Sequence, residues 1–281
     1  MIDLHAHTTK SDGTDSPLTL VKKAASSGIT LLGITDHDST AGWQEAIDSL
    51  HGSLQLALGA EVSCLTEDGI SVHMLGLLFD GENQPLQQLL SDSRDTRIPR
   101  MKKMIENLQG AGYDITLEDV EAATPAGATV GRPHLADALV VKKIVKSRDD
   151  AFTDLLNNDS PFYVSHFAPT PEDAIRAIRA AGGVAVIAHP FASRRGQILT
   201  PDSFASLVAA GLNGIEVFHR DQSEDERKQL LVIAEELELA VTGSSDYHGT
   251  GKLNELGENT TSPAEWERLE AMADQRRVVQ R

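Results

Sequence analysis

The chain has 281 residues, 42 acidic and 25 basic side chains, and a formal net charge of −17. A chain of this length can bury roughly three quarters of its extended surface, so it can form one large domain or two modest ones. A single cysteine, Cys64, excludes a disulfide framework and favours a reducing compartment. The sequence has no apolar run long enough for a membrane helix and no signal-peptide pattern. The acidic excess argues against wrapping duplex nucleic acid, but not against a small nucleotide or a strand end in a pocket. We therefore expect a cytoplasmic protein that binds neither membranes nor duplexes.

Short apolar runs alternate with segments that have helix signals. The runs predict buried parallel strands, at 1–5, 31–35, 55–63, 71–79, 184–188, 214–218 and 239–243. Ser16-Pro17, Thr170-Pro171, Thr200-Pro201 and Ser262-Pro263 each place an N-cap residue before a proline, which is typical of a helix start. This alternation predicts an α/β fold with a parallel sheet, either open or closed.

Residues 81–165 break this rhythm. They lack strand-like runs, and helix starts are expected near Gln84-Pro85, Leu117-Glu118 and Arg132-Pro133. The segment has a net charge of −3, against −8 for residues 1–80 and −6 for residues 166–281. We predict a helical insertion or cap domain at 81–165, between two halves of a barrel formed by 1–80 and 166–281. The two halves together are slightly short for an eightfold βα barrel.

Histidines and carboxylates lie at or near the ends of the predicted strands. Because the carboxyl ends of parallel strands form one face, these side chains should meet at one mouth. Histidine and carboxylate are ligands for Zn, Mn or Fe, so the pattern predicts a metal site. The residues, in chain order, are His5, His7, His37, Glu61, His73, His189, Asp246 and His248.

Each of these residues also has an ordinary structural interpretation. His73 alone could be a hydrogen-bonded core histidine, and Glu61 alone could pair with an arginine. Asp12, in Ser11-Asp12-Gly13, could be a turn residue, and Asp246 could cap a helix. The pair in His5-Ala6-His7 is a stronger signal, because alternate residues of an extended segment point the same way. Histidines and carboxylates at six of the predicted strands favour a metal site.

These motifs together resemble the polymerase and histidinol phosphatase (PHP) family. The motifs that carry the resemblance are Asp3-Leu4-His5-Ala6-His7-Thr8 with Ser11-Asp12-Gly13-Thr14, Gly33-Ile34-Thr35-Asp36-His37-Asp38, Gly59-Ala60-Glu61, Val72-His73-Met74-Leu75-Gly76, Ala188-His189-Pro190 and Gly243-Ser244-Ser245-Asp246-Tyr247-His248. The resemblance implies a distorted (β/α)7 TIM-like barrel, which agrees with seven predicted strands. Gly131-Arg132-Pro133-His134 in the insertion resembles the subgroup of 3′,5′-nucleoside bisphosphate phosphatases and the 5′→3′ exoribonuclease called RNase AM.

The resemblance also implies two to three divalent metals held by nine residues. His5, His7, Glu61 and Asp246 would hold the first metal, Asp12, His37 and His248 the second, and His73 and His189 the third, with Glu61 shared. Asp12 stands where many family members have histidine, which fits the nucleotide phosphatase subgroup. Manganese is the first expectation, with zinc or iron as alternatives.

This metal set suggests how the reaction would proceed. Two cations about 3.5–4 Å apart can hold a bridging hydroxide and stabilise the entering and leaving oxygens of a phosphoryl group. The chain has neither a Gly-x-Ser-x-Gly nucleophile motif nor a Walker-type phosphate loop. One of Asp36 and Asp38 is expected to orient a ligand histidine. Alternatively, Asp38 could cap a helix that starts near Thr40.

Substrate phosphates need cationic partners. Arg132 and His134 of the insertion motif are candidates, and so are Arg194 and Arg195, because the guanidinium fork suits phosphate. A surface ion pair remains an alternative for Arg194 and Arg195. His219 could contact the substrate, protonate the leaving group, or have a structural role. His51 and His166 are interpreted as surface or structural residues.

Four functions are compatible with this sequence. The first is a phosphatase that hydrolyses small 3′,5′-bisphosphorylated nucleotides by means of a metal-bound hydroxide. The second is a 5′→3′ exoribonuclease acting on short 5′-phosphorylated RNA. The third is an amidohydrolase, which is disfavoured because the ten lysines avoid the predicted strands and cannot provide a bridging ligand there. The fourth is a non-catalytic metal-binding domain, which is disfavoured by the full ligand set.

Overall fold

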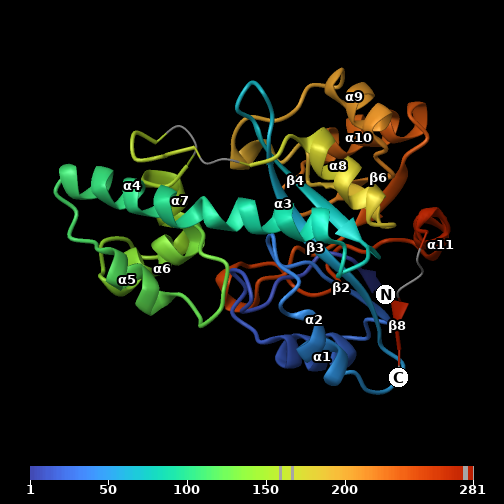
Figure 1. The fold of residues 1–281 in the computed structure, drawn as a ribbon, viewed down its shortest axis with the longest axis horizontal. Coiled ribbons are helices and arrows are strands. Elements are labelled where there is room, and N and C mark those ends of the chain that lie inside the picture. Colours follow the sequence, from blue (N-terminus) through green and yellow to red (C-terminus); the bar gives the residue numbers. More distant parts are fainter. Residues whose placement is uncertain (158–159, 166–167, 275–277, 281) are drawn as a thin grey trace.

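The computed structural model describes residues 1–157, 160–165, 168–274 and 278–280, and its sheet is a nearly closed barrel (Figure 1). The main strands are hydrogen-bonded in chain order, and each overlaps a predicted strand. A backbone bridge between Ala6 and Tyr247 brings the two ends of the sheet together. The α/β barrel prediction is thus confirmed. The strands are β1 (Ile2–Asp3), β2 (Leu31–Ile34), β3 (Gln55–Leu65), β4 (Ser71–Leu77), β5 (Val184–Ala188), β6 (Gly214–Phe218) and β7 (Ala240–Gly243).

The prediction that all strands are parallel is wrong for one strand. β4 pairs antiparallel with both β3 and β5. The cause is the short connection from β3 to β4, closed by a hydrogen bond from Thr66 N to Ile70 O (3.0 Å). A parallel crossover needs a dozen or more residues, so this connection can only form a hairpin. A further short strand, β8 (Val278–Val279), was not predicted and pairs antiparallel with β3.

Helices surround the barrel and begin where the capping signals indicate. The side chains of Ser16, Thr170 and Ser262 each accept a hydrogen bond from a backbone N–H in the first turn of the helix they precede. One start is displaced, because the helix after Thr200-Pro201 begins at Ser203. Among the described residues, no helix is long and apolar enough to cross a membrane. These helices are α1 (Pro17–Ser26), α2 (Trp43–Asp48), α8 (Pro171–Ala180), α9 (Ser203–Ala210), α10 (Glu224–Glu236) and α11 (Pro263–Met272).

The segment between β4 and α8 is helical, as its composition predicts. It contains α3 (Gln84–Asp95), α4 (Arg97–Gly110), α5 (Leu117–Ala123), α6 (Arg132–Val141) and α7 (Arg148–Asp154). Figure 1 shows α4 to α7 as a lobe beside the barrel. A separate apolar core holds this lobe together and includes Met104, Leu135 and Leu156. Leu86 and Leu90 of α3 pack instead into the barrel core, so the segment is anchored to the barrel by its first helix.

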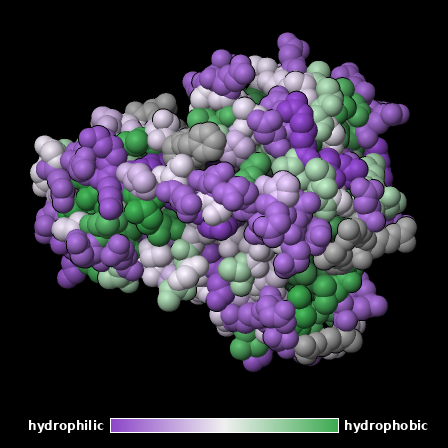
Figure 2. Space-filling view, viewed as in Figure 1, coloured by the Kyte–Doolittle hydropathy of each residue, from purple (hydrophilic) through white to green (hydrophobic). Residues whose placement is uncertain are grey.

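The backbone is unusual where β5 and β7 end. His189 and Asp246, directly after or close to these strands, have φ values of 33° and 52°. Non-glycine residues seldom adopt this left-handed region, and such residues cluster at functional sites. The surface is more ordinary. Figure 2 shows hydrophilic side chains over most of one face, with smaller apolar patches between them.

Candidate metal and active site

Four predicted ligands converge at the barrel mouth. His5 Nε2 lies 3.3 Å from Glu61 Oε2 and 3.4 Å from Asp246 Oδ1. His7 Nε2 lies 3.1 and 3.3 Å from the same two oxygens. All four side chains are buried. Ligand atoms about 2.0–2.2 Å from one cation are separated by distances of this order, so the arrangement suits a metal ion.

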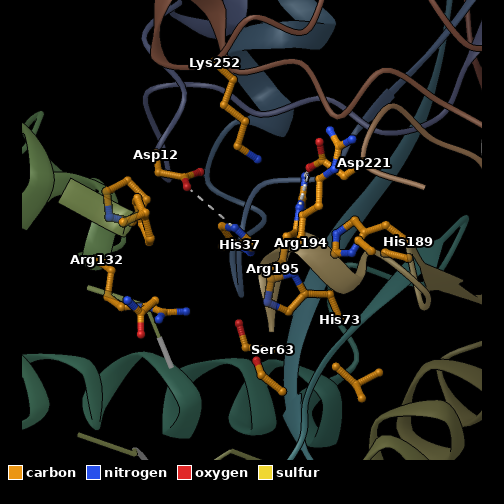
Figure 3. Close-up of a pocket in the computed structure, with 18 of the residues that line it drawn as sticks. Asp12, His37, Ser63, His73, Arg132, His189, Arg194, Arg195, Asp221 and Lys252 are labelled. Atoms are coloured by element: carbon orange, nitrogen blue, oxygen red, sulfur yellow. Dashed lines mark hydrogen bonds and ion pairs between the residues drawn. The ribbon is translucent and has the colours of Figure 1, made fainter. Parts of the chain in front are cut away.

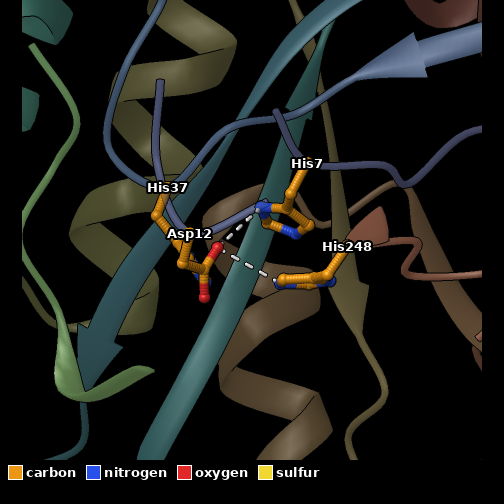
Figure 4. Close-up of side chains that lie close together, drawn as sticks. All are labelled: His7, Asp12, His37 and His248. Carbon is orange, nitrogen blue, oxygen red and sulfur yellow. Dashed lines mark ion pairs between the residues drawn. The ribbon is translucent and has the colours of Figure 1, made fainter. Parts of the chain in front are cut away.

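The second predicted group is gathered around Asp12 (Figure 4). Asp12 Oδ1 lies 3.2 Å from His248 Nε2 and 3.6 Å from His7 Nδ1. Asp12 Oδ2 lies 3.7 Å from His37 Nε2. These four side chains can place ligand atoms within one metal-sized group. His7 thus lies between the first group and the predicted trio of Asp12, His37 and His248.

Glu61 connects the second group to the third. Its Oε1 lies 2.8 Å from His73 Nδ1 and 3.3 Å from His189 Nε2. Its Oε2 lies 3.0 Å from His37 Nδ1. Glu61 sits in the middle of β3, which continues to Leu65 and pairs with β4. The hairpin thus carries Glu61 and His73 to the mouth together. All nine predicted ligands meet there.

The orientation of two imidazole rings favours a cation between them. His5 Nε2 and His7 Nε2 are only 3.0 Å apart. His5 Nδ1 lies 3.1 Å from Glu216 Oε1, to which it donates. His7 Nδ1 lies 3.3 Å from Ser11 Oγ, whose own proton goes to Asp36 Oδ1 at 2.7 Å. Because Ser11 donates its proton to Asp36, His7 Nδ1 must donate to Ser11. In the neutral rings both Nε2 atoms then carry lone pairs that face each other, and a cation bound by both would remove this repulsion.

Unsatisfied polar atoms point to the same conclusion. Among the described residues, His37 Nδ1 and His248 Nε2 are buried and make no hydrogen bond, although carboxylate oxygens lie only 3.0 and 3.2 Å away. The His248 ring is fixed on its other side, where Nδ1 donates to the backbone oxygen of Asp246 at 2.8 Å. Buried nitrogens without hydrogen bonds are costly, and coordination would use their lone pairs. The donor set fits divalent cations.

The electrostatics of the cluster also favour a bound cation. Burial would raise the pKa of Asp246, but Lys252 and His248 hold it well below its usual range. Burial would lower the pKa of His7, but hydrogen bonds to Asp246 and Glu61 raise it to about 9. The surroundings of His7 thus stabilise positive charge strongly enough to overcome desolvation. A divalent cation would benefit from the same oxygens.

Glu216 is a functional residue that the sequence reasoning missed. It lies inside β6 and is fully buried. Its Oε1 accepts from His5 Nδ1, and its Oε2 accepts from the backbone N–H of His189 at 2.9 Å. One carboxylate therefore orients a ligand ring and the backbone of a second ligand. The available signal was a charged residue in the otherwise apolar run from Gly214 to Phe218.

One of Asp36 and Asp38 is predicted to orient a ligand histidine. Asp36 has such a link, through Ser11, whereas Asp38 contacts no ligand histidine in the contacts described. Asp36 accepts from Thr8 N and Ser11 Oγ, both at 2.7 Å, and reaches His7 only through Ser11. Asp38 accepts from Ser63 N at 2.8 Å and forms a buried ion pair with Arg97. The capping alternative for Asp38 is wrong, because α2 begins at Trp43 after Gly42. Asp38 instead ties α4 of the lobe to the barrel mouth.

A cavity of about 600 Å³ opens over the cluster (Figure 3). Asp12, His37, His73 and His189 lie in its wall. The rest of its lining is rich in cationic side chains, which suit anionic ligands. They are Arg97, Arg100, Arg132, Arg148, Arg194, Arg195, Arg220 and Lys252. The structure thus brings the predicted Arg132, Arg194 and Arg195 to one cavity.

The lobe side of this cavity is built around an aromatic ring. The guanidinium groups of Arg100 and Arg132 lie 5.1 and 5.2 Å from the centre of the Tyr163 ring. Burial and the neighbouring charge of Arg132 lower the pKa of Arg100. The sequence reasoning missed Arg97 and Arg100, although their i,i+3 spacing places them on one face of α4. Crowded, partly buried cations are a suitable environment for phosphate.

Two predicted substrate contacts lie behind the cavity wall. His134 is buried, and its Nδ1 accepts from Gly131 N at 3.1 Å, which caps α6. His219 is fully buried, and its Nδ1 accepts from Asp221 N at 3.0 Å. Its other ring nitrogen therefore carries the proton and donates to Asp246 Oδ2 at 3.3 Å. The geometry supports the structural alternative for His219. His51 is exposed, and His166 lies outside the described residues.

Comparisons with known proteins agree with this geometry. The PHP domain model matches residues 3–136. A 5′-3′ exoribonuclease of Haemophilus influenzae is 34% identical over 92% of this chain and 93% of its own length. A 3′,5′-nucleoside bisphosphate phosphatase of Chromobacterium violaceum is 33% identical over 89% of this chain and 88% of its own length. The structure of a Bifidobacterium adolescentis protein described as a metal-dependent phosphoesterase has a TM-score of 0.90 and 40% identity, covering 96% of both chains.

The chain belongs to the PHP family. It is a hydrolase of the metal-dependent phosphoesterase class.

Proposed function

We propose that this protein hydrolyses phosphomonoesters of small nucleotides of the 3′,5′-bisphosphate type. The observation that carries the proposal is the position of the histidine–carboxylate cluster at the base of a cavity lined with arginines. A bisphosphorylated substrate has two anionic groups. One would react at the cluster, while Arg100 and Arg132 bind the other. A cavity of about 600 Å³ is of the size that encloses a small ligand.

The nine predicted ligands would hold two to three divalent metals, with manganese first and zinc or iron as alternatives. Such cations supply activated water and neutralise charge on the phosphoryl oxygens. The protein's own residues would fix the geometry. Glu216 holds His5 with Nε2 toward the cluster, and Asp36 holds His7 through Ser11. The substrate would be oriented by arginines on the opposite wall.

We also propose that residues 81–165 act as a cap domain over a barrel made of 1–80 and 166–281. Asp38 at the mouth is bound by two side chains of this segment: Arg97 contacts its carboxylate and Arg94 its backbone oxygen. Arg148 of α7 also reaches the mouth, where it donates to the backbone oxygen of Asp12 at 3.4 Å. A cap held this closely would select short substrates and exclude duplexes. We propose a cytoplasmic location.

The alternative function is 5′→3′ exoribonuclease activity on short 5′-phosphorylated RNA. The identity to the H. influenzae exoribonuclease is nearly equal to that of the C. violaceum phosphatase, at 34% and 33%. In both reactions water cleaves a P–O ester bond, in a phosphomonoester or in a phosphodiester, so the same cluster could serve either. The two functions differ in which bond is placed at the cluster.

The test uses the full chain, stripped of metal with a chelator and reloaded with manganese. It is incubated separately with 3′-phosphoadenosine 5′-phosphate and with a 5′-phosphorylated oligoribonucleotide, and the products are resolved. Release of inorganic phosphate from the first, without mononucleotides from the second, supports the phosphatase. Release of mononucleotides from the oligoribonucleotide, without phosphate from 3′-phosphoadenosine 5′-phosphate, would favour the exoribonuclease instead. A metal-loaded protein that cleaves neither would contradict both.

A further inference from the structure

The two carboxylate oxygens of Asp246 face different surroundings. Oδ1 lies 3.4 Å from His5 Nε2 and 3.3 Å from His7 Nε2, within the proposed metal cluster. Oδ2 lies 2.8 Å from Arg195, 2.9 Å from Lys252 Nζ and 3.3 Å from His219 Nε2. Asp246 therefore separates the proposed cations from a group of cationic or proton-donating side chains.

The three partners of Oδ2 differ in how firmly they are held. His219 is buried and fixed by Asp221 N. Arg195 is bound by two carboxylates, since it contacts Asp221 Oδ2 at 2.7 Å as well as Asp246. Within the described part of the chain, the only ion pair of Lys252 is the one with Asp246. Its side chain is 31% exposed and lies in the cavity wall. Figure 3 shows this side chain reaching into the cavity above His37.

The loop that precedes Lys252 is hydrogen-bonded to the barrel mouth. Gly251 N donates to His248 O at 3.3 Å, and Thr250 N donates to Thr14 Oγ1 at 2.8 Å. A Cβ on Gly251 would come within 2.2 Å of an Arg148 nitrogen, so the loop is pressed against the lobe. A lysine stem has four rotatable carbons and can redirect its ammonium group without moving this loop.

We propose that Lys252 is a phosphoryl-binding residue that competes with the metal for Asp246 before substrate arrives. In the metal-free protein its ammonium group neutralises Oδ2. A cation bound at Oδ1 withdraws negative charge from the carboxylate and repels the ammonium group, and both effects weaken the ion pair. Lys252 then binds a phosphoryl oxygen of the substrate. Arg195 remains in place because Asp221 holds it.

This inference rests on the proposed function, but its first test does not. Manganese affinity is measured by calorimetry for Lys252→Met, Lys252→Arg and a matched control, Lys228→Met. Lys228 is an exposed lysine of α10 that pairs with Asp225, so its loss removes the same charge at the surface. Competition predicts that Lys252→Met binds manganese about tenfold more tightly than Lys228→Met. Lys252→Arg should retain the wild-type affinity. A merely supporting role would instead weaken manganese binding in Lys252→Met, and that result, or no change, would overturn the competition.

The second test measures binding of inorganic phosphate to the manganese-loaded proteins. One charge-assisted hydrogen bond is lost in Lys252→Met, so phosphate should bind roughly 10-fold more weakly, with partial recovery in Lys252→Arg. In turnover of 3′-phosphoadenosine 5′-phosphate, the same loss should raise KM more than it lowers kcat. If phosphate binds Lys252→Met and Lys228→Met equally, Lys252 does not hold the phosphoryl group. If the wild type binds manganese and phosphate but cleaves no nucleotide, the proposed function fails while the role of Lys252 still stands or falls on the two binding measurements.

Discussion

The two walls of the cavity are built in different ways. Beneath the barrel wall lie His5, His7 and Glu61, which stand on a strand or a few residues after one and are each at most 1% exposed. The lobe wall carries Arg100 and Arg132 on helices, with long side chains stacked on Tyr163. Short side chains on strands fix positions well, as metal coordination requires. Long side chains on an inserted segment can change between relatives without disturbing that geometry. In the proposed function, the barrel would therefore supply the chemistry and the lobe the choice of substrate.

The walls also differ in charge, which the net charge of the chain conceals. The total of −17 appears unfavourable for phosphate ligands. Yet eight cationic side chains line one cavity of the described structure. Cations at the cluster would add further positive charge beside Asp12, Glu61 and Asp246. Local charge, rather than the total, decides which ligands this site accepts.

The largest effect is expected for the barrel wall, in Glu61→Gln. The two oxygens of Glu61 contact five histidines, so this change removes a shared buried charge. We expect less than one manganese per chain and a loss of phosphate release of at least about 10³-fold. Elemental analysis and product assays measure both. Glu67→Gln, at an exposed position in the same hairpin, is the control. A Glu61→Gln protein with full metal content would show that this wall is not the metal site.

Glu216→Gln tests whether the barrel wall depends on its support. The amide cannot accept as strongly from His5 Nδ1, and it retains the shape of the side chain. Such supporting contacts typically contribute 10- to 100-fold to metal affinity, and a loss of about that size is expected. Manganese titration of the metal-free protein measures it. Glu265→Gln on α11, whose carboxylate accepts from Val241 N, is a comparison away from the site. Equal affinities for both variants would contradict the role assigned to Glu216.

Arg132→Ala tests the lobe wall. The variant should retain its manganese, because Arg132 contacts none of the nine proposed ligands in the contacts described. KM for 3′-phosphoadenosine 5′-phosphate should rise about tenfold, since Arg100 remains to hold the phosphate. Arg176→Ala on α8, an exposed arginine, is the control. Loss of metal from Arg132→Ala would contradict the proposal that the barrel wall binds metal and the lobe wall binds only substrate.

The sequence predicted the barrel wall better than the lobe wall, for a physical reason. His5, His7 and Asp246 follow strands whose carboxyl ends must meet, so strand order alone brought them together. His73 was placed correctly although its strand runs antiparallel, because it lies near the beginning of β4 and not the end. The apolar pattern shows where each strand lies but not which way it runs. The direction of β4 follows from its connection to β3, which is too short for a parallel crossover.

Arg97, Arg100 and Glu216 could not be predicted in the same way. The direction in which a helical arginine points depends on how the lobe packs against the barrel, which no local pattern encodes. Glu216 acts on His5 across 211 positions of the chain. His134 and His219 show the reverse case. A histidine at either position suits phosphate chemistry, but in the structure His134 caps α6 and His219 supports Asp246.

The last prediction concerns the pH dependence of metal binding at the barrel side of the cavity. In the metal-free protein the pKa of His7 is raised to about 9. Below that pH the ring carries a proton on a nitrogen that coordination requires, so metal binding must release it. Manganese affinity should therefore rise with pH from pH 7, by about tenfold per pH unit for each proton that must be released. Burial would lower the pKa of His5, but Glu61, Glu216 and Asp246 raise it well above its usual value, so His5 adds to the proton release. The pKa of His248 is only about 4, because burial and Lys252 lower it, so this ring adds no proton release in that range. Titrations in two buffers of different ionisation enthalpy count the protons released. Affinity that is flat from pH 7 to 8.5, with no proton release, would mean that His7 is not a ligand.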